Sequence, residues 1–385
     1  MRFFHFSEMP YPYIPEDYYE RYGSARVTLP RSLVNPHLAH DLYKRYLDEY
    51  TFASEAGFDL MINEHHQTMT CIDVSIGVTA SALIQRTNKG KILMLGYQIA
   101  NENPVHVAEE VAMLDTISGG RILCGFVRGV GMETHPSNVN PVFNRERFYE
   151  AHDLILKAWT SGETFNWEGK HFQYRYVNVW PPTFQQPYPE IWTTGGSDKE
   201  NIQWIAKNKY HFAVLFAGFN QAASVFDMYR EHSREIGLGE PEPSRFAYAC
   251  LCYTAETDEQ AEKEGKQLWW YLKTKEPYWF RKPPGYTPVS DRKKIFQSGT
   301  MSAHREATWE QLKEWGMVIV GSPDTVAKRI KAYYETTGGA SLILMNQAGF
   351  LPHELTLKSL RLFSEEVMPQ VKHLGEEKKR ETIGL

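Results

Sequence analysis

The sequence has 385 residues, of which 42% are hydrophobic and 23% are charged, a balance typical of a globular protein with a sizeable core. The formal net charge is only -5, and no block of Lys and Arg alternates with aromatic residues. These features exclude a nucleic acid or an acidic membrane surface as the expected partner. We therefore expect a small-molecule ligand.

The sequence shows neither a membrane span nor an export signal. No apolar run reaches the roughly 18 residues that a membrane-spanning helix needs. The start of the chain, Met1 to His5, lacks the apolar segment of a signal peptide. We therefore expect a cytoplasmic protein.

Short apolar runs that are typical of buried strands alternate with helical patterns along the whole chain. Two of the predicted helices are Asn35–Ala56 and Pro104–Ser118, the second with Asn103 as its N-cap. Eight such repeats in one chain predict a single-domain (β/α)8 barrel over residues 1–385, with an open doubly wound sheet as the alternative. The predicted strands are Phe3–Phe6, Leu60–Asn63, Ile92–Ile99, Ile122–Val127, Ile191–Thr194, Phe212–Phe216, Phe246–Tyr253 and Ser341–Met345.

A bare barrel takes about 250 residues, so extended loops must hold the remainder. The two best candidates are the Tyr-rich segment Ser7–Asn35 after the first strand and the segment Lys275–Glu306 after the seventh strand and its helix. Loops after barrel strands lie on the catalytic face, and long ones are often lids. We expect both segments to cover the site, the second as a lid insertion, although solvated decoration is an equal alternative for Lys275–Glu306.

Polar side chains follow the second predicted strand directly, in the run Asn63 to Gln67. In a barrel this position faces the active site, and neighbouring His65 and His66 would point to opposite sides of an extended segment. We expect one of the two histidines to face the cavity, with Glu64 as a further candidate. A hydrogen-bonded strand end is an equally good interpretation of the residue types alone.

Two further strand ends suit an anion. Arg128 lies between glycines after the fourth strand, where the backbone can approach a ligand closely. Gly195, Gly196 and Ser197 follow the fifth strand and precede a helix, so free N–H groups and the helix N-terminus favour a phosphate there. Ser197 could also serve simply as the helix N-cap. The similar run Gly321 to Thr325 is interpreted as an ordinary helix start.

These motifs together resemble the bacterial luciferase-like flavin monooxygenase family. The resemblance is carried by Glu64-His65-His66, by Asn103-Pro104 through Gly119-Gly120-Arg121, by Gly125 to Gly129, by Gly195-Gly196-Ser197 and by Gly321-Ser322-Pro323. Each motif is common, but their order and spacing cover nearly the whole chain. The chain lacks the Glu-Ser phosphate segment of the luciferases proper, which makes a light-emitting role unexpected.

The resemblance implies an FMN site at the carboxyl ends of the barrel strands. It places the phosphate near Arg128 and the Gly195-Gly196-Ser197 turn, with Arg147 as a second phosphate ligand. It implies a non-prolyl cis peptide at Leu95-Gly96. It assigns His65 as proton donor or acceptor beside the flavin, with His66 as the next choice. The residues expected beside the flavin ring are Glu64, Gly96, Gln98 and Val127.

The implied activity is a two-component oxygenation, in which a separate flavin reductase supplies reduced FMN and the enzyme transfers one oxygen atom from O2 to an apolar or aromatic substrate. Family members are commonly homodimers. The nearest alternative is hydride transfer with the deazaflavin F420 in the same fold. Another is a non-catalytic flavin-binding partner subunit. A metal-dependent hydrolase is disfavoured because no ligand set has metal spacing.

Overall fold

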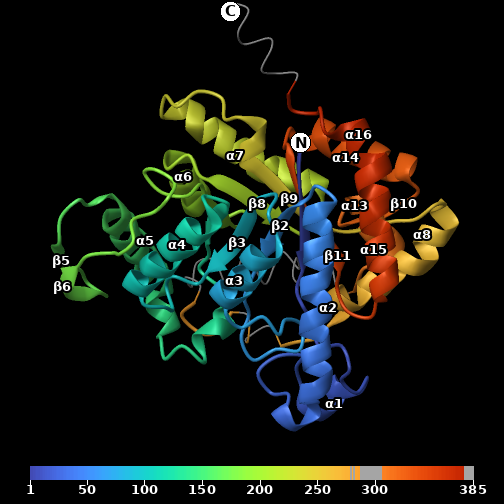
Figure 1. Cartoon of the computed structure of the whole chain (residues 1–385), viewed down its shortest axis with the longest axis horizontal. Coiled ribbons are helices and arrows are strands. Elements are labelled where there is room, and N and C mark those ends of the chain that lie inside the picture. The colour runs from blue at the N-terminus through green and yellow to red at the C-terminus, as the bar shows by residue number, and fades with distance from the viewer. Residues whose placement is uncertain (278–279, 281, 287–305, 377–385) are drawn as a thin grey trace, which may run out of the picture.

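The computed structural model describes residues 1–277, 280, 282–286 and 306–376, and its centre is a parallel β-sheet closed into a barrel (Figure 1). Eight strands close the barrel in chain order, because the last pairs with the first and β9 pairs with both β8 and β11. The (β/α)8 prediction is confirmed. The eight strands are β1 (Arg2–Ser7), β2 (Asp59–Ile62), β3 (Ile92–Tyr97), β4 (Ile122–Phe126), β7 (Ile191–Thr194), β8 (His211–Leu215), β9 (Phe246–Thr254) and β11 (Ser341–Gln347).

Three strands were not predicted. β10 (Val318–Gly321) pairs with the last residues of β9, beyond the point where β8 ends. Its short apolar run has no periodicity of its own, and only pairing with β9 makes it a strand. The hairpin of β5 (Phe165–Glu168) and β6 (Gln173–Val177) is antiparallel and separate from the barrel. Its residues are mostly exposed or half-buried, so no buried apolar run marks it.

Helices surround the barrel and connect its strands (Figure 1). Asn103 caps α4, as predicted, and Asn35, which was predicted as the first helical residue, caps α2; each accepts hydrogen bonds from two backbone N–H groups of the first turn. The principal helices are α2 (Pro36–Glu55), α3 (Ile76–Arg86), α4 (Pro104–Ser118), α5 (Asn144–Thr160), α6 (Lys199–Lys207), α7 (Phe219–Glu235), α8 (Asp258–Gly265), α13 (Trp309–Trp315), α14 (Pro323–Thr337) and α15 (His353–Leu362). Shorter helices are α1 (Tyr18–Tyr22), α9 (Trp269–Lys273) and α16 (Met368–Val371).

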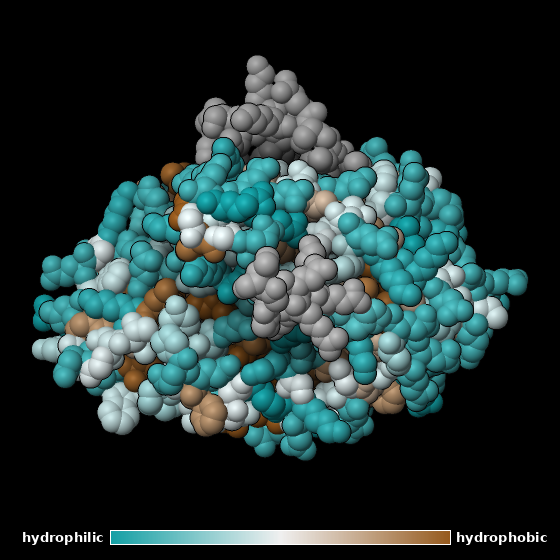
Figure 2. Space-filling model, turned by 90° about the horizontal axis from the view of Figure 1, so that it is seen from above, coloured by the Kyte–Doolittle hydropathy of each residue, from teal (hydrophilic) through white to brown (hydrophobic). Residues whose placement is uncertain are grey.

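The hydrophobic core has two layers, as expected of a barrel with an outer ring of helices. One cluster fills the barrel interior and includes Phe4, Leu93 and Trp192. The larger cluster lies between the strands and the helices and includes Tyr46 and Val111. At the end of the molecule opposite α1, the surface is mostly hydrophilic, with apolar residues in separate patches (Figure 2).

The segment after β1 is long, as predicted, and Figure 1 places it at the opposite end of the molecule from the N-terminus. It contains α1, one turn of 3-10 helix at Arg31–Leu33 and an isolated bridge between Arg26 and Thr68. Most of the predicted lid insertion, 275–306, lies outside the described residues. Among the helices of the described residues, none is long and apolar enough to cross a membrane.

Candidate active site

A cavity of about 580 Å³ opens at the carboxyl ends of the barrel strands. Eight of the residues singled out in the sequence line it, namely Glu64, His65, Gly96, Gln98, Val127, Arg128, Gly195 and Gly196. His66, Arg147 and Ser197 are not among its lining residues. The strand ends thus bring together two groups of residues, one around the histidine and one around the glycine turn, that are far apart in the sequence.

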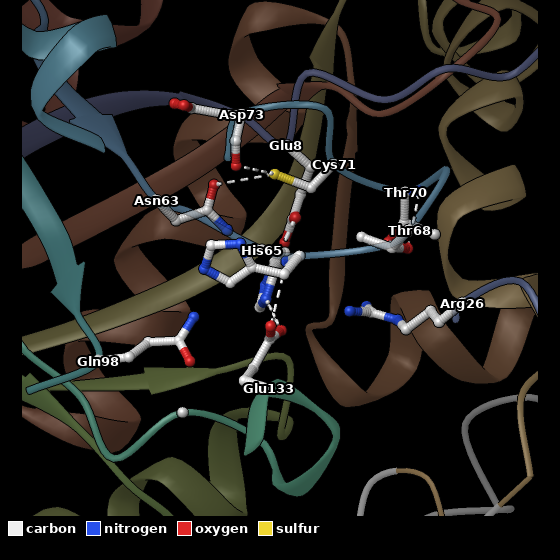
Figure 3. A network of polar contacts seen from close by, with 12 residues as sticks. Glu8, Arg26, Asn63, His65, Thr68, Thr70, Cys71, Asp73, Gln98 and Glu133 are labelled. Atoms are coloured by element: carbon white, nitrogen blue, oxygen red, sulfur yellow. Dashed lines mark hydrogen bonds and ion pairs between the residues drawn. The ribbon is translucent and has the colours of Figure 1, made fainter. Parts of the chain in front are cut away.

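His65 lies between two acidic side chains at one end of this cavity (Figure 3). Its Nδ1 is 2.8 Å from Oε1 of Glu133, which is fully buried, and its Nε2 is 3.8 Å from Oε2 of Glu8. The backbone N–H of His66 donates to Oε2 of the same Glu133. Burial by itself would raise the pKa of Glu133, but the hydrogen bond and charge of His65, together with the nearby Arg26 and His66, lower it. Glu133 therefore holds the imidazole in a fixed orientation, with Nε2 as its second proton-carrying atom.

Glu64 lines the cavity as a neutral carboxylic acid at neutral pH. Burial, and next the neighbouring Glu102, raise its pKa to about 9. The backbone N–H of Ile76, the first residue of α3, donates to Oε2 of Glu64. Burial raises the pKa of Glu102 as well, but the side-chain hydrogen bond that the two groups share raises the pKa of Glu64 and lowers that of Glu102, which places the shared proton on Glu64. A buried hydrogen-bond donor thus follows β2.

The other end of the cavity is suited to an anion. Arg128 and the Gly195-Gly196 turn line it, and a Cβ atom placed on Gly196 would meet nothing within 4 Å. The helix that follows, α6, begins at Lys199 and is capped by Asp198, whose Oδ1 accepts from the N–H of Asn201. The suggestion that Ser197 is the N-cap is therefore wrong, because the helix begins one residue later and an Asp competes for its first N–H groups.

Arg145 lines the cavity close to this turn, although it was not predicted. Its guanidinium pairs with Asp198 and, at 2.6 Å, with Glu200. Burial works against its charge, but Asp198 and Glu200 raise its pKa, so it stays cationic. Arg147, predicted as a phosphate ligand, instead donates from Nε to the carbonyl oxygen of Ala100. Its guanidinium also stacks on the ring of Phe172 at 4.5 Å.

The middle of the cavity is formed where β3 and β4 approach each other closely. The peptide bond Leu95-Gly96 is cis, as the family resemblance implies. A Cβ atom on Gly96 would lie 2.4 Å from the carbonyl oxygen of Gly125, so only glycine fits there. Leu95, Val127 and Met61 supply apolar surface beside it.

Several cavity residues were missed by the sequence analysis. Glu8 comes directly after β1, so its place at a strand end could have indicated it. Arg26 lies in a loop and Arg145 near the start of α5, where no local pattern marks them. Glu133 was also missed; it does not line the cavity but contacts His65 from a 3-10 turn at Gly131–Thr134. Tyr271 on α9 also lines the cavity. These side chains reach the site only through the tertiary fold.

Comparison with known proteins agrees with this geometry. Residues 27–341 match the model of a family described as luciferase-like monooxygenase. The chain is 26% identical over 348 residues to 2,5-diketocamphane 1,2-monooxygenase 2 of Pseudomonas putida, covering 83% of this chain and 91% of that protein.

Two solved structures share the fold at low sequence identity. One is the oxygenating constituent of 3,6-diketocamphane monooxygenase from Pseudomonas putida, a type II Baeyer-Villiger monooxygenase in complex with FMN. It is 21% identical, with a TM-score of 0.69 over 86% of this chain and 94% of that one. The other is a coenzyme F420-dependent tetrahydromethanopterin reductase from Methanopyrus kandleri. It is 17% identical, with a TM-score of 0.64 over 85% and 95% of the chains.

The barrel, with its cavity at the strand ends, defines an enzyme architecture. The family match spans most of the sequence, and the chain belongs to the luciferase-like monooxygenase family. It is an enzyme, a flavin-dependent oxidoreductase.

Proposed function

We propose that the chain binds FMN and, with reduced FMN and O2, inserts one oxygen atom into an apolar or aromatic organic substrate. One observation carries the proposal. A single cavity is lined at one end by Arg128 and the Gly195-Gly196 turn and at the other end by His65, which contacts the buried carboxylate of Glu133. The first feature suits a phosphate and the second suits proton transfer. The relatives named after oxygenases, one of them in complex with FMN, support the same activity.

The cavity residues fit FMN. Arg128 and the free N–H groups of Gly195 and Gly196 would bind the phosphate, and the open space at Gly196 leaves room for close approach. Arg145 is the second cation we propose there, because it lines the cavity, whereas Arg147 does not. Ser197 lies beside this turn, although it does not line the cavity.

The flavin ring would lie against the apolar surface of Leu95 and Val127, beside Gly96 and Gln98. When bound, the reduced flavin supplies the electrons that activate O2. Glu64, whose single proton is donated to Glu102, would lie beside the polar edge of the ring as a neutral group. The apolar walls would exclude water from the reacting atoms.

His65 is the residue we propose to carry a proton, at Nε2, because Nδ1 is engaged by Glu133. His66 does not line the cavity and is the second choice. We further propose that a separate flavin reductase supplies the reduced FMN and that the chain works as a homodimer.

The test begins with the cofactor. Calorimetric titration of the chain with FMN and with F420 should show preferential binding of FMN. Arg128→Ala should weaken FMN binding by about tenfold or more, as expected for a lost hydrogen bond to a charged group. Arg147→Ala is the matched control and should retain affinity. Preferential binding of F420 would instead support hydride transfer.

Turnover is tested with chemically reduced FMN and isotopically labelled dioxygen, using a bicyclic ketone and a panel of aromatic ketones. Label should enter the product with the wild type, and His65→Ala should lose most of this incorporation. Product without label would contradict the oxygenation. Unchanged incorporation in His65→Ala would remove His65 from the mechanism.

A further inference from the structure

The end of the cavity around His65 is polar in a way that FMN binding does not require. β1 and β7 are the first and fifth barrel strands, so they lie on opposite sides of the barrel. Glu8 follows β1, whereas the glycine turn proposed for the phosphate follows β7. Glu8 and Arg26 therefore face the cavity from the side away from the phosphate turn, and Tyr271 joins them from α9.

Two buried atoms in this region have no hydrogen-bond partner within the described part of the chain. Arg26 is 4% exposed, and its Nε pairs with Oε2 of Glu276 at 2.9 Å, but its Nη1 donates to nothing. Glu8 is also 4% exposed, and its Oε1 accepts from the hydroxyl of Tyr271 at 2.7 Å. Its Oε2 accepts no hydrogen bond. Leaving such groups unpaired is costly, and in a ligand cavity a ligand can supply the partners.

The two unpartnered atoms are of opposite kind. A guanidinium N–H needs an acceptor, whereas a carboxylate oxygen needs a donor. In Figure 3 the Arg26 side chain points toward the region of His65 and Glu133, and Oε2 of Glu8 lies 3.8 Å from Nε2 of His65, the residue proposed to carry the proton. A ligand that satisfies both would present its polar edge beside that proton carrier.

We propose that the substrate is a neutral molecule carrying both a hydrogen-bond acceptor and a hydroxyl or amine donor, as a hydroxyaryl ketone does. The acceptor would bind Nη1 of Arg26, and the donor would bind Oε2 of Glu8. This inference rests on the proposed oxygenation and names its substrate class.

The local charge decides against an anionic substrate. Burial by itself lowers the pKa of Arg26, but Glu276, Tyr271, Glu8 and Glu133 raise it, so the guanidinium stays charged. Three acidic side chains thus surround one arginine. A carboxylate on the substrate would be repelled, because more negative than positive side chains surround it here. A neutral substrate can instead place its carbonyl against Arg26 and its hydroxyl against Glu8.

The test measures binding without turnover, with the full chain in oxidised form, both with and without FMN. The probes are meta-hydroxyacetophenone, which has a donor and an acceptor, acetophenone, which lacks the donor, and meta-hydroxybenzoate, which is an anion. The hydroxy ketone should bind about tenfold tighter than acetophenone, because a buried charged acceptor gains its partner, and the benzoate should bind more weakly than the hydroxy ketone.

Three variants test which residues cause the preference for the hydroxy ketone. Glu8→Ala should abolish the preference for the hydroxy ketone over acetophenone. Arg26→Lys keeps a cation beside Glu276 but loses the guanidinium fork, and it should weaken both ketones alike. Gln221→Ala, at a polar residue that lines the cavity from α7, is the matched control and should leave the preference unchanged.

Equal binding of the two ketones, binding of neither, or an unchanged preference in Glu8→Ala would overturn the inference. The same samples are titrated with FMN. Normal FMN binding without a ketone preference refutes only the substrate class. Failure of the wild type to bind FMN refutes the proposed function, whatever the ketones do.

Discussion

Glu64 offers a sharp test of the electrostatics of the site, through the substitution Glu64→Gln. The carboxyl group is 8% exposed, and its pKa is raised from 4.5 to about 9. A neutral Gln has nearly the shape of the protonated acid. It can accept from the N–H of Ile76 and donate to Glu102, as the protonated Glu64 does. The substitution therefore removes the titration while keeping the hydrogen bonds.

The expected magnitude follows from proton linkage. Between pH 4.5 and about 9 the folded chain holds a proton on Glu64 that the unfolded chain has released. Each pH unit in this window lowers the free energy of unfolding of the wild type by roughly 1.4 kcal/mol. From pH 6 to pH 8 the loss from this one group is about 3 kcal/mol at most, and Glu64→Gln avoids it.

Urea unfolding at a series of pH values measures this difference. The stability of Glu64→Gln relative to the wild type should rise steadily from pH 6 to pH 8. Glu109→Gln, which replaces an exposed acid on α4, should run parallel to the wild type and serves as the control. Parallel curves for Glu64→Gln would refute the reasoning, since they would show that the folded chain holds no extra proton there.

Three other outcomes are expected. Gly96→Ala should lose roughly 1 to 3 kcal/mol in urea unfolding, because its Cβ would overlap the carbonyl of Gly125, while Gly196→Ala should keep wild-type stability. Glu133→Gln should lose about 1 to 3 kcal/mol at pH 7. Since the pKa of Glu133 is lowered, this loss should shrink as the pH falls below 4.5, and a constant loss would contradict the pairing with His65. A melting curve of Glu8→Ala should stay cooperative, because the substitution removes one hydrogen bond, that from Tyr271 to Oε1, while Oε2 accepts none among the described residues.

Most strands could be predicted from the sequence alone. Runs such as Ile122–Phe126 are apolar on both faces, because one face of the strand packs in the barrel interior and the other packs against the helices. Such a continuous apolar run is easily recognised in the sequence. The N-cap of α4, Asn103, was likewise predicted from the sequence, since capping depends on neighbours a few residues away. β10 could not be predicted from the sequence, because it is a strand only through its pairing with β9, which lies far away in the chain.

The residues of the candidate site likewise include some that the sequence predicts and some that it does not. Residues that directly follow a strand, such as His65, Arg128 and Gly195, could be predicted, because the barrel brings all carboxyl strand ends to one face. The roles of Glu133 and Arg26 could not, since loop conformation sets their positions.

The sequence by itself therefore determined the barrel and the location of its cavity, because apolar periodicity and strand-end polarity are local properties. Only the tertiary structure decided which charges meet inside the cavity. Burial pushes the pKa of Glu64 up, whereas pairing with His65 pulls that of Glu133 down. The pKa values of these two glutamates shift in opposite directions because their neighbours come from distant segments of the chain. A local sequence pattern gives no information on the distances between such segments.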